Sequence, residues 1–260
     1  MITITFANQK GGVAKTVTAC NLAAGLAQKG YRVVTIDSDP QCNLTFVSNI
    51  NPLDCELTLF DMYEGTSTWE NTVVHAPEYD LIPGDLRLTT ADLAYAGKLG
   101  REYMLEHALK GMEGKYDYCI IDTPPQIGLL VENALICTDQ VIIPLTTDAF
   151  SIQGLSNFVE IMASMKKQLP DKMKFKIQGL LITRYQKNTN SGSSLMNTIQ
   201  EIGKSINTYV YKTIIGERVA VRDSSIERMS TLLARPKSQS AKEYMSFVNE
   251  YLEREGKQNG

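Results

Sequence analysis

A glycine-rich stretch near the N-terminus has the residue types of a phosphate-binding loop. From Lys10 to Thr16 it reads KGGVAKT. Backbone N–H groups at the start of a helix bind phosphate, and glycines let the backbone approach it closely. In such a loop a lysine contacts the β- and γ-phosphates, and a hydroxyl residue ligates Mg²⁺. The pattern predicts these roles for Lys15 and Thr16; a glycine-rich turn with an incidental lysine is the alternative.

Two further segments place carboxylates where such a loop needs them. The run VVTI ends at Asp37 and is followed by SDPQ, and the run CII ends at Asp122 and is followed by TPP. Transfer of a phosphoryl group to water needs a positioned nucleophile and a metal ion that neutralises charge. Open α/β sheets bind ligands at the carboxyl ends of their strands. Either aspartate alone fits a strand-end cap, but both together with the loop favour a nucleotide site.

The elements that must position these residues follow from the periodicity of apolar side chains. Strands are expected at residues 2–7, 32–36, 116–122, 140–144, 177–183 and 210–215. Helices are expected after the loop, around residues 128–137, and at the C-terminus. The first helix has an apolar stripe at Ala19, Leu22, Ala23, Leu26 and Ala27, and the last has one at Tyr244, Phe247, Val248, Tyr251 and Leu252.

Near-continuous apolar strands between amphipathic helices are typical of a parallel sheet that is covered on both faces. We therefore predict the α/β class and a single-domain P-loop NTPase fold over residues 1–260. The sheet is expected to be mostly parallel and twisted, with helices on both faces. Residues 51–100 have the weakest pattern, and we expect short helices and an extended segment at 79–83 there.

The composition fits one ordered domain. With 260 residues, 43% of them apolar, the chain can bury one substantial core. No apolar run approaches the roughly 18 residues of a membrane helix, and the N-terminus has no readable export signal. The five scattered cysteines fit the reduced thiols of a cytosolic protein.

Charge is distributed unevenly along the chain. Residues 1–150 contain 9 basic and 19 acidic side chains, a net of −10, whereas residues 151–260 contain 17 and 10, a net of +7. Such a division suggests a face for an anion or polyanion, with ordinary solvated surface as an equal alternative. The basic side chains of the second half include Arg184, Lys187, Lys204, Lys212, Arg218, Arg222, Arg228, Arg235, Lys237 and Lys242.

These motifs resemble those of one superfamily. With its additional lysine, the loop resembles the deviant Walker A motif of ParA/MinD ATPases, and ANQKGGVAKT is similar to the ParA branch. The sequence DSDPQ resembles the DxDPQ element of the family, and CIID resembles its Walker B strand. PLTTD at 144–148 and RPKS at 235–238 extend the resemblance over most of the chain. Because the first expected strand begins at residue 2, we interpret the chain as the short form, without a preceding helix-turn-helix domain.

The resemblance implies roles for individual residues. Lys10 would reach across a dimer interface to the partner's nucleotide, and Asp39 would orient the attacking water. Asp37 would support the Mg²⁺ shell, Asp122 would hold the ion through water, and Asp148 would lie at the interface. The catalytic residues are then Lys10, Lys15 and Asp39, and the metal residues Thr16, Asp37 and Asp122. Nucleotide contacts are implied for Gly11, Gly12, Val13, Ala14, Lys15, Thr16, Val17 and Arg184.

One position departs from the family pattern. Ala14 stands where the family has glycine. If this position needs a positive φ, alanine there costs about 1 kcal/mol. The departure leaves a second hypothesis open, in which the protein is a nucleotide-gated binding switch with little or no ATP hydrolysis.

The resemblance implies an ATP-dependent DNA-partition ATPase with ATP, ADP and Mg²⁺ as ligands. Two subunits would close around ATP and bind non-specific DNA through C-terminal basic residues, for which we predict Arg218 and Arg222. A ParB-like partner would stimulate hydrolysis and release the dimer. We expect a cytoplasmic protein that associates with the nucleoid in its ATP state. The acid-rich tail disfavours a MinD-like membrane anchor, and no cysteine pair supports an iron–sulfur reductase.

Overall fold

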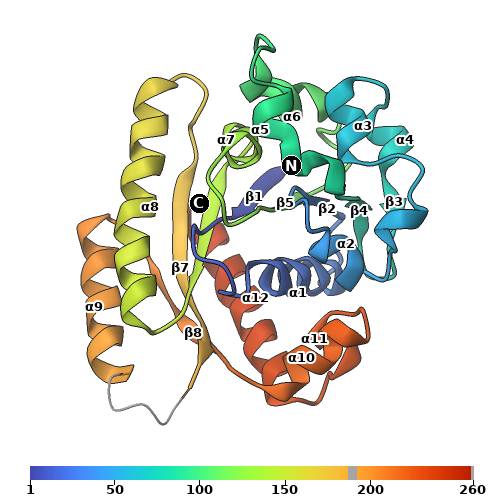
Figure 1. Ribbon diagram of the computed structural model, residues 1–260. Coiled ribbons are helices and arrows are strands. Elements are labelled where there is room, and N and C mark those ends of the chain that lie inside the picture. The colour runs from blue at the N-terminus through green and yellow to red at the C-terminus, as the bar shows by residue number, and fades with distance from the viewer. Residues whose placement is uncertain (187–191, 259–260) are drawn as a thin grey trace.

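The computed structural model of the chain describes residues 1–186 and 192–258 (Figure 1). Its centre is an eight-stranded sheet with the order β3-β4-β2-β5-β1-β6-β7-β8. In the described chain the strands pair in parallel, except for β3, which is antiparallel to β4 at one edge. The strands are β1 (Ile2–Phe6), β2 (Val33–Asp37), β3 (Val74–His75), β4 (Asp80–Ile82), β5 (Tyr118–Asp122), β6 (Gln140–Leu145), β7 (Lys176–Tyr185) and β8 (Val210–Gly216).

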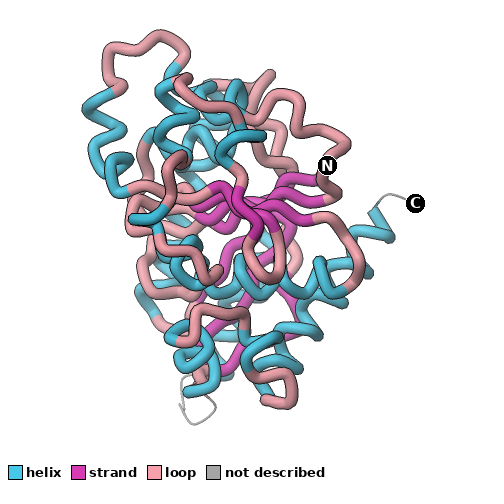
Figure 2. The backbone as a smooth tube through the Cα atoms, turned by 90° about the vertical axis from the view of Figure 1, so that its right-hand side faces the viewer, coloured by secondary structure: helices cyan, strands magenta, loops and turns pink. Residues whose placement is uncertain are grey.

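Helices cover both faces of this twisted sheet (Figure 2). They are α1 (Lys15–Gln28), α2 (Asn43–Val47), α3 (Leu59–Glu64), α4 (Trp69–Thr72), α5 (Ala91–Ala94), α6 (Met104–Ala108), α7 (Leu129–Ile136), α8 (Ala149–Gln168), α9 (Gly192–Ser205), α10 (Val219–Ile226), α11 (Thr231–Ala234) and α12 (Gln239–Gln258). Ile4 and Phe6 of β1 pack in the same core as α1 and α12, whereas Val141 and Ile143 of β6 pack in a core that includes α8. The predicted fold class is confirmed.

The helix after the loop is more deeply buried than its apolar stripe predicted. Thr18 and Asn21, which lie outside that stripe, are also buried. The reason is that both α12 and α11 pack against α1; the Asn21 side chain accepts from the N–H of Leu232 in α11. A Cβ atom on Gly25 would lie 2.4 Å from Cγ2 of Val248, so glycine is needed where α1 and α12 touch. Four residues of the predicted apolar side of α12, Tyr244, Phe247, Val248 and Tyr251, are buried against α1 and the sheet, and Leu252 is half-buried.

The register of the strands brings the predicted chemistry to one edge of the sheet. Phe6, the last residue of β1, pairs with Asp122, the last residue of β5. Asp122 in turn pairs with Asp37, the last residue of β2. The glycine-rich loop leaves β1 at this same edge and leads into α1. Parallel pairing thus places both aspartates beside the start of the loop.

The weakly patterned region contains short elements, as predicted. Besides α3, α4 and α5 it holds the 3₁₀ helices η1 (Pro52–Asp54) and η2 (Leu86–Thr90), with η3 (Arg101–Tyr103) just beyond. The extended segment expected at 79–83 forms β4, but its antiparallel partner β3 was not predicted, because a two-residue strand has no alternation to detect. Lys187 lies outside the described residues. In the part of the chain that is described, no helix has the length and apolarity to cross a lipid bilayer.

Candidate nucleotide site

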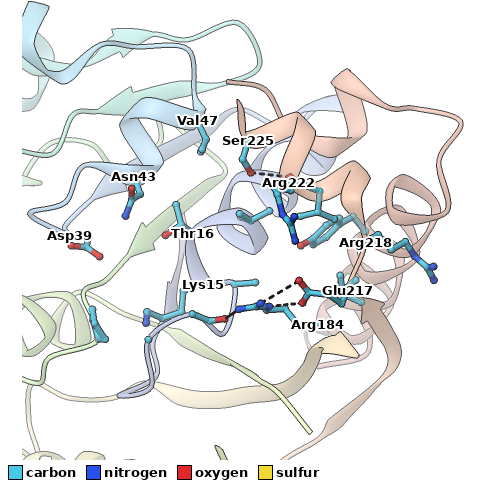
Figure 3. A pocket seen from close by; sticks show the side chains of 18 of the residues that line it. Lys15, Thr16, Asp39, Asn43, Val47, Arg184, Glu217, Arg218, Arg222 and Ser225 are labelled. Atoms are coloured by element: carbon cyan, nitrogen blue, oxygen red, sulfur yellow. Dashed lines mark hydrogen bonds and ion pairs between the residues drawn. The ribbon is translucent and has the colours of Figure 1, made fainter. Parts of the chain in front are cut away.

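A cavity of about 580 Å³ lies at the carboxyl edge of the sheet (Figure 3). Its walls come from the loop and the start of α1, the segment between Asp39 and Val47, the end of β7, and the segment between Ile215 and Ser225. Its volume is in the range of small-molecule sites, about 300–1,000 Å³. The predicted residues that line it are Gly11, Gly12, Ala14, Lys15, Thr16, Val17, Asp39, Arg184, Arg218 and Arg222.

The loop is braced by its own polar groups and by β6. The Asn8 side chain donates to the carbonyl of Pro144 at 2.8 Å and accepts from the N–H of Lys10 at 2.9 Å. Lys15 Nζ donates to the carbonyls of Asn8 and Lys10 at 3.1 and 3.4 Å, so the ammonium group folds back over the loop. Burial lowers the pKa of Lys15, and the carboxylates of Asp122 and Asp39 oppose this shift. An ammonium group that donates to carbonyl oxygens is well placed to donate to a phosphate oxygen instead.

Ala14 adopts the conformation that makes glycine preferable. Its φ and ψ are 60° and 34°, in the left-handed region, at the residue that precedes α1. An alanine held there costs about 1 kcal/mol relative to an unstrained backbone. The neighbouring Val13 is buried and does not line the cavity; its carbonyl accepts from Thr183 Oγ1 at 3.0 Å. Val13 can therefore contact a ligand through its backbone N–H alone.

The carboxylate of Asp122 is the most unusual group at the site. It is fully buried, and neither oxygen has a hydrogen-bond partner within the described residues. Burial, reinforced by the Asp37 carboxylate, raises the pKa of Asp122 well above its usual range, while the nearby Thr16 hydroxyl and then the Lys15 ammonium oppose the shift. Buried charges are costly unless they are paired or coordinate metals. An orphaned carboxylate beside Thr16 therefore fits a magnesium site, with Asp122 acting directly or through water.

The described residues contain no group of three or more His, Cys, Asp and Glu side chains arranged to hold a metal ion. Mg²⁺ bound with a nucleotide keeps several waters and uses one or two carboxylates together with the phosphates.

The Asp37 carboxylate accepts hydrogen bonds from neighbouring protein groups. Its Oδ2 accepts from both the N–H and the hydroxyl of Thr45 at 2.7 Å, and its Oδ1 accepts from the N–H of Asp39 at 3.3 Å. Burial raises the pKa of Asp37 to about 7, against the effect of the Thr45 hydrogen bonds. A Cβ on Gly84 would lie 3.0 Å from the carboxyl carbon, so glycine is required there. Asp37 thus anchors the start of α2 and the Asp39 segment; no spacing in the sequence indicated Thr45 or Gly84.

Lys10 points away from the cavity. Its Nζ lies 2.7 Å from both carboxylate oxygens of Asp148 and 3.0 Å from the Ser151 hydroxyl. Burial alone would raise the pKa of Asp148. The hydrogen bonds that its carboxylate accepts from Lys10, Thr146 and Ser151 outweigh this effect and hold the pKa well below its usual range. The two residues matched to a dimer face therefore contact each other within one chain.

The three arginines of the prediction have different surroundings. Arg184 donates to the Gly12 carbonyl at 2.7 Å and pairs with Glu217 at 2.5 Å (Figure 3). Arg218 pairs with Glu243 at 2.6 Å. Arg222 is exposed and has no ion pair among the described residues. Sequence patterns gave no sign of the two glutamates, because their partners lie far away along the chain.

With this loop between β1 and α1 and an unpartnered carboxylate on the adjoining strand, the chain is a P-loop nucleotide-binding protein. A model of the AAA domain family matches residues 1–176. The chain is 33% identical over 249 residues to the sporulation initiation inhibitor protein Soj of Bacillus subtilis, covering 95% of this chain and 96% of Soj. It is 30% identical over 256 residues to the chromosome partitioning protein ParA of Caulobacter vibrioides, covering 97% and 94%. The chain therefore belongs to the ParA family of P-loop ATPases.

A solved structure agrees with this assignment. Cobyrinic acid a,c-diamide synthase of Mycobacterium smegmatis with bound ADP and magnesium superimposes with a TM-score of 0.81 at 27% identity. The match covers 95% of this chain and 92% of that protein. The P-loop fold predicted from the sequence is thus shared with a protein whose structure contains a nucleotide.

Proposed function

We propose that this protein is a DNA-partition ATPase that dimerises around ATP and Mg²⁺ and binds DNA without sequence preference. A ParB-like centromere-binding partner then stimulates hydrolysis, and the dimer leaves the DNA. The observation that carries the proposal is the buried Asp122 carboxylate, which accepts no hydrogen bond from the described residues, beside a lysine folded over the loop. Support also comes from a relative named as a chromosome partitioning protein and from a structural relative with ADP and magnesium.

The geometry suggests how these residues share the chemistry of hydrolysis. The N–H groups from Gly11 to Val17 and the ammonium of Lys15 bind the phosphates. Thr16 and Asp122 would hold Mg²⁺, with Asp37 supporting the segment beside it, and the ion would supply neutralisation of charge on the phosphates. Asp39 lines the cavity and orients the attacking water. Arg184 reaches the nucleotide from the end of β7.

The proposed dimer depends on Lys10. Within a single subunit its ammonium group pairs with Asp148. The side chain of Lys10 is 32% exposed and that of Asp148 is 40% exposed. An ion pair this exposed contributes at most about 1 kcal/mol. A partner's triphosphate, which carries several negative charges, is therefore able to draw Lys10 away from Asp148.

DNA is proposed to bind through basic side chains of both subunits. Arg222 is exposed and free of an acidic partner in the described chain, so it suits a phosphate contact better than Arg218, whose charge is offset by Glu243. Two subunits double the number of contacts, and weak contacts then combine by effective concentration. The protein would therefore stay on the nucleoid, within the cytoplasm, as long as ATP is bound.

DNA binding is expected to be ATP-dependent and strongly weakened by salt. In a gel shift with DNA of unrelated sequence, ATP should promote binding, whereas ADP and the absence of nucleotide should not. Arg222→Ala, measured at saturating ATP, should reduce the slope of log affinity against log salt concentration by about 2 per dimer, because one phosphate contact is lost in each subunit. Lys167→Ala, at an exposed lysine of α8, is the control. Equal binding in all nucleotide states would contradict the proposal.

A second function is favoured by one observation, the left-handed backbone of Ala14. Strain at this position weakens the fit of the loop to the phosphates, and a site weakened in this way would hold ATP without hydrolysing it efficiently. The protein would then be a nucleotide-gated DNA-binding switch.

Ala14→Gly separates the two functions. The ATPase rate should rise about fivefold if glycine relieves about 1 kcal/mol more strain in the transition state than in the ATP-bound ground state. Ala27→Gly is the matched control; it lies inside α1, where glycine should lower the free energy of unfolding by about 1 kcal/mol without raising the rate. A partner-stimulated rate in the unmodified chain supports the enzyme. ATP-dependent DNA binding with no turnover supports the switch.

A further inference from the structure

Two ion pairs hold the turn between β8 and α10: one connects it to Arg184 at the end of β7, and the other connects it to Glu243 of α12. On one side, Glu217 accepts from the Arg184 guanidinium at 2.5 and 3.2 Å. On the other side, Arg218 donates to Glu243 of α12 at 2.6 Å, and Glu243 also accepts from the N–H of Gly216 at 2.9 Å. Three consecutive residues are therefore tied to two separate parts of the molecule.

Arg184 extends the first of these ties into the phosphate loop. Its Nη1 donates to the carbonyl of Gly12 at 2.7 Å (Figure 3). The residue has a φ of 50°, and the register of β7 with β8 shifts between Ile182 and Tyr185. Irregularities of this kind redirect a side chain, and here the guanidinium is directed back over the loop. A continuous path of contacts thus joins the loop to Glu217.

A phosphate group in the loop changes the balance at Arg184. It is an acceptor comparable to a carboxylate for a guanidinium group, so it competes with Glu217 for the same donors. The side chains of Arg184 and Glu217 are 49% and 26% exposed, and an ion pair this exposed is weak enough to rearrange. Occupancy of the loop must therefore alter how firmly Glu217 is held.

Glu217 is also positioned to pass such a change to α10. The next residue, Arg218, is the N-terminal cap residue of that helix. A Cβ on Gly216 would lie 3.0 Å from the Arg218 guanidinium, so this glycine lets Arg218 fold back toward Glu243. Gly216 and Arg218 are held by Glu243 of α12, whereas Glu217 between them is held by Arg184, so the start of α10 is tied both to α12 and to the phosphate loop. α10 carries Arg222.

We propose that Glu217 is a positioning residue that couples occupancy of the phosphate loop to the placement of α10, acting through Arg184. The nucleotide state would thereby control how Arg222 is presented at the surface. This inference rests on the proposed nucleotide site, and it adds the route by which that site reaches the basic C-terminal half.

Hydrogen–deuterium exchange of backbone amides, with and without saturating ADP, tests the coupling. In the unmodified protein ADP should slow exchange in the loop and change exchange over residues 217–226 at least about threefold, within the usual range of coupling between sites. In Glu217→Gln the loop should still respond, but residues 217–226 should not. Glu217→Asp keeps the carboxylate and should restore part of the response, which a space-filling role would not predict.

Glu227→Gln is the matched control, because it breaks a similar ion pair, with Arg235, in the same region without a link to the loop. It should respond to ADP like the unmodified protein. If Glu217→Gln does not fold, Glu217→Ala, which also removes the carboxylate and leaves Arg184 in place, tests the same path with the same expectation. A persistent response over 217–226 in these variants, or none in the unmodified protein, overturns the coupling. A loop that does not respond to ADP in the unmodified protein removes the proposed nucleotide site as well.

Discussion

Replacing Lys15 by alanine is expected to lower the affinity for ATP and ADP at least about a hundredfold, equivalent to roughly 3 kcal/mol. The ammonium group is buried over the loop with carbonyl partners alone, and hydrogen bonds to charged groups contribute about 1.5–3 kcal/mol. Its loss also leaves the Asp122 and Asp39 carboxylates without the nearest opposing charge, which repels the phosphates further. Isothermal titration calorimetry with Mg²⁺ present measures the effect.

Lys29→Ala is a suitable control for this experiment. Lys29 is exposed at the opposite end of α1, so the substitution removes the same charge from the same helix without touching the loop. Circular dichroism during heating verifies that both variants unfold cooperatively. Nucleotide affinity in Lys15→Ala within threefold of the unmodified protein would exclude the loop as the phosphate site.

Replacing Lys10 by alanine is expected to weaken ATP-dependent dimerisation strongly. A symmetric dimer makes each contact twice. Two contacts of about 1.5 kcal/mol each weaken the dimer roughly a hundredfold when they are removed. Analytical ultracentrifugation with a non-hydrolysable ATP analogue measures the dissociation constant. Affinity for the nucleotide in the monomer should fall much less than in Lys15→Ala, because Lys10 does not line the cavity of its own chain.

Asp148→Asn distinguishes the two partners proposed for Lys10. The substitution removes the carboxylate that holds Lys10 within one chain but keeps the lysine itself. Dimerisation should then need the same or a lower concentration of the ATP analogue. A dimer that forms normally with Lys10→Ala would show that the lysine does not act across the interface, and the assembly would have to be explained by other contacts.

The sequence was most informative where function depends on neighbours along the chain. The loop from Lys10 to Thr16 is a local motif, and its place between a strand and a helix follows from the periodicity of apolar side chains. The ends of the strands at Asp37 and Asp122 were predicted for the same reason. Parallel pairing then aligns these ends, and the register Phe6↔Asp122 and Asp37↔Asp122 agrees with that expectation.

The side-chain contacts that hold the site together could not be predicted from the sequence. Lys10 meets Asp148 across 138 positions, and Arg184 meets the Gly12 carbonyl across 172. A charged residue has no periodicity that reveals its partner, so these pairings depend on how the β6 and β7 ends lie against the loop. The same limit applies to Arg218, whose charge is offset by Glu243 of a distant helix.

The amino-acid sequence by itself therefore determined the fold class, the phosphate loop and the two strand-end aspartates, because each depends on local spacing and on the pairing of parallel strands. The tertiary structure decided which side chains are free to act. It buried the Asp122 carboxylate, placed Ala14 in a left-handed conformation, and joined Arg184 to Glu217. These outcomes depend on packing between segments that are distant in the chain, which no spacing rule encodes.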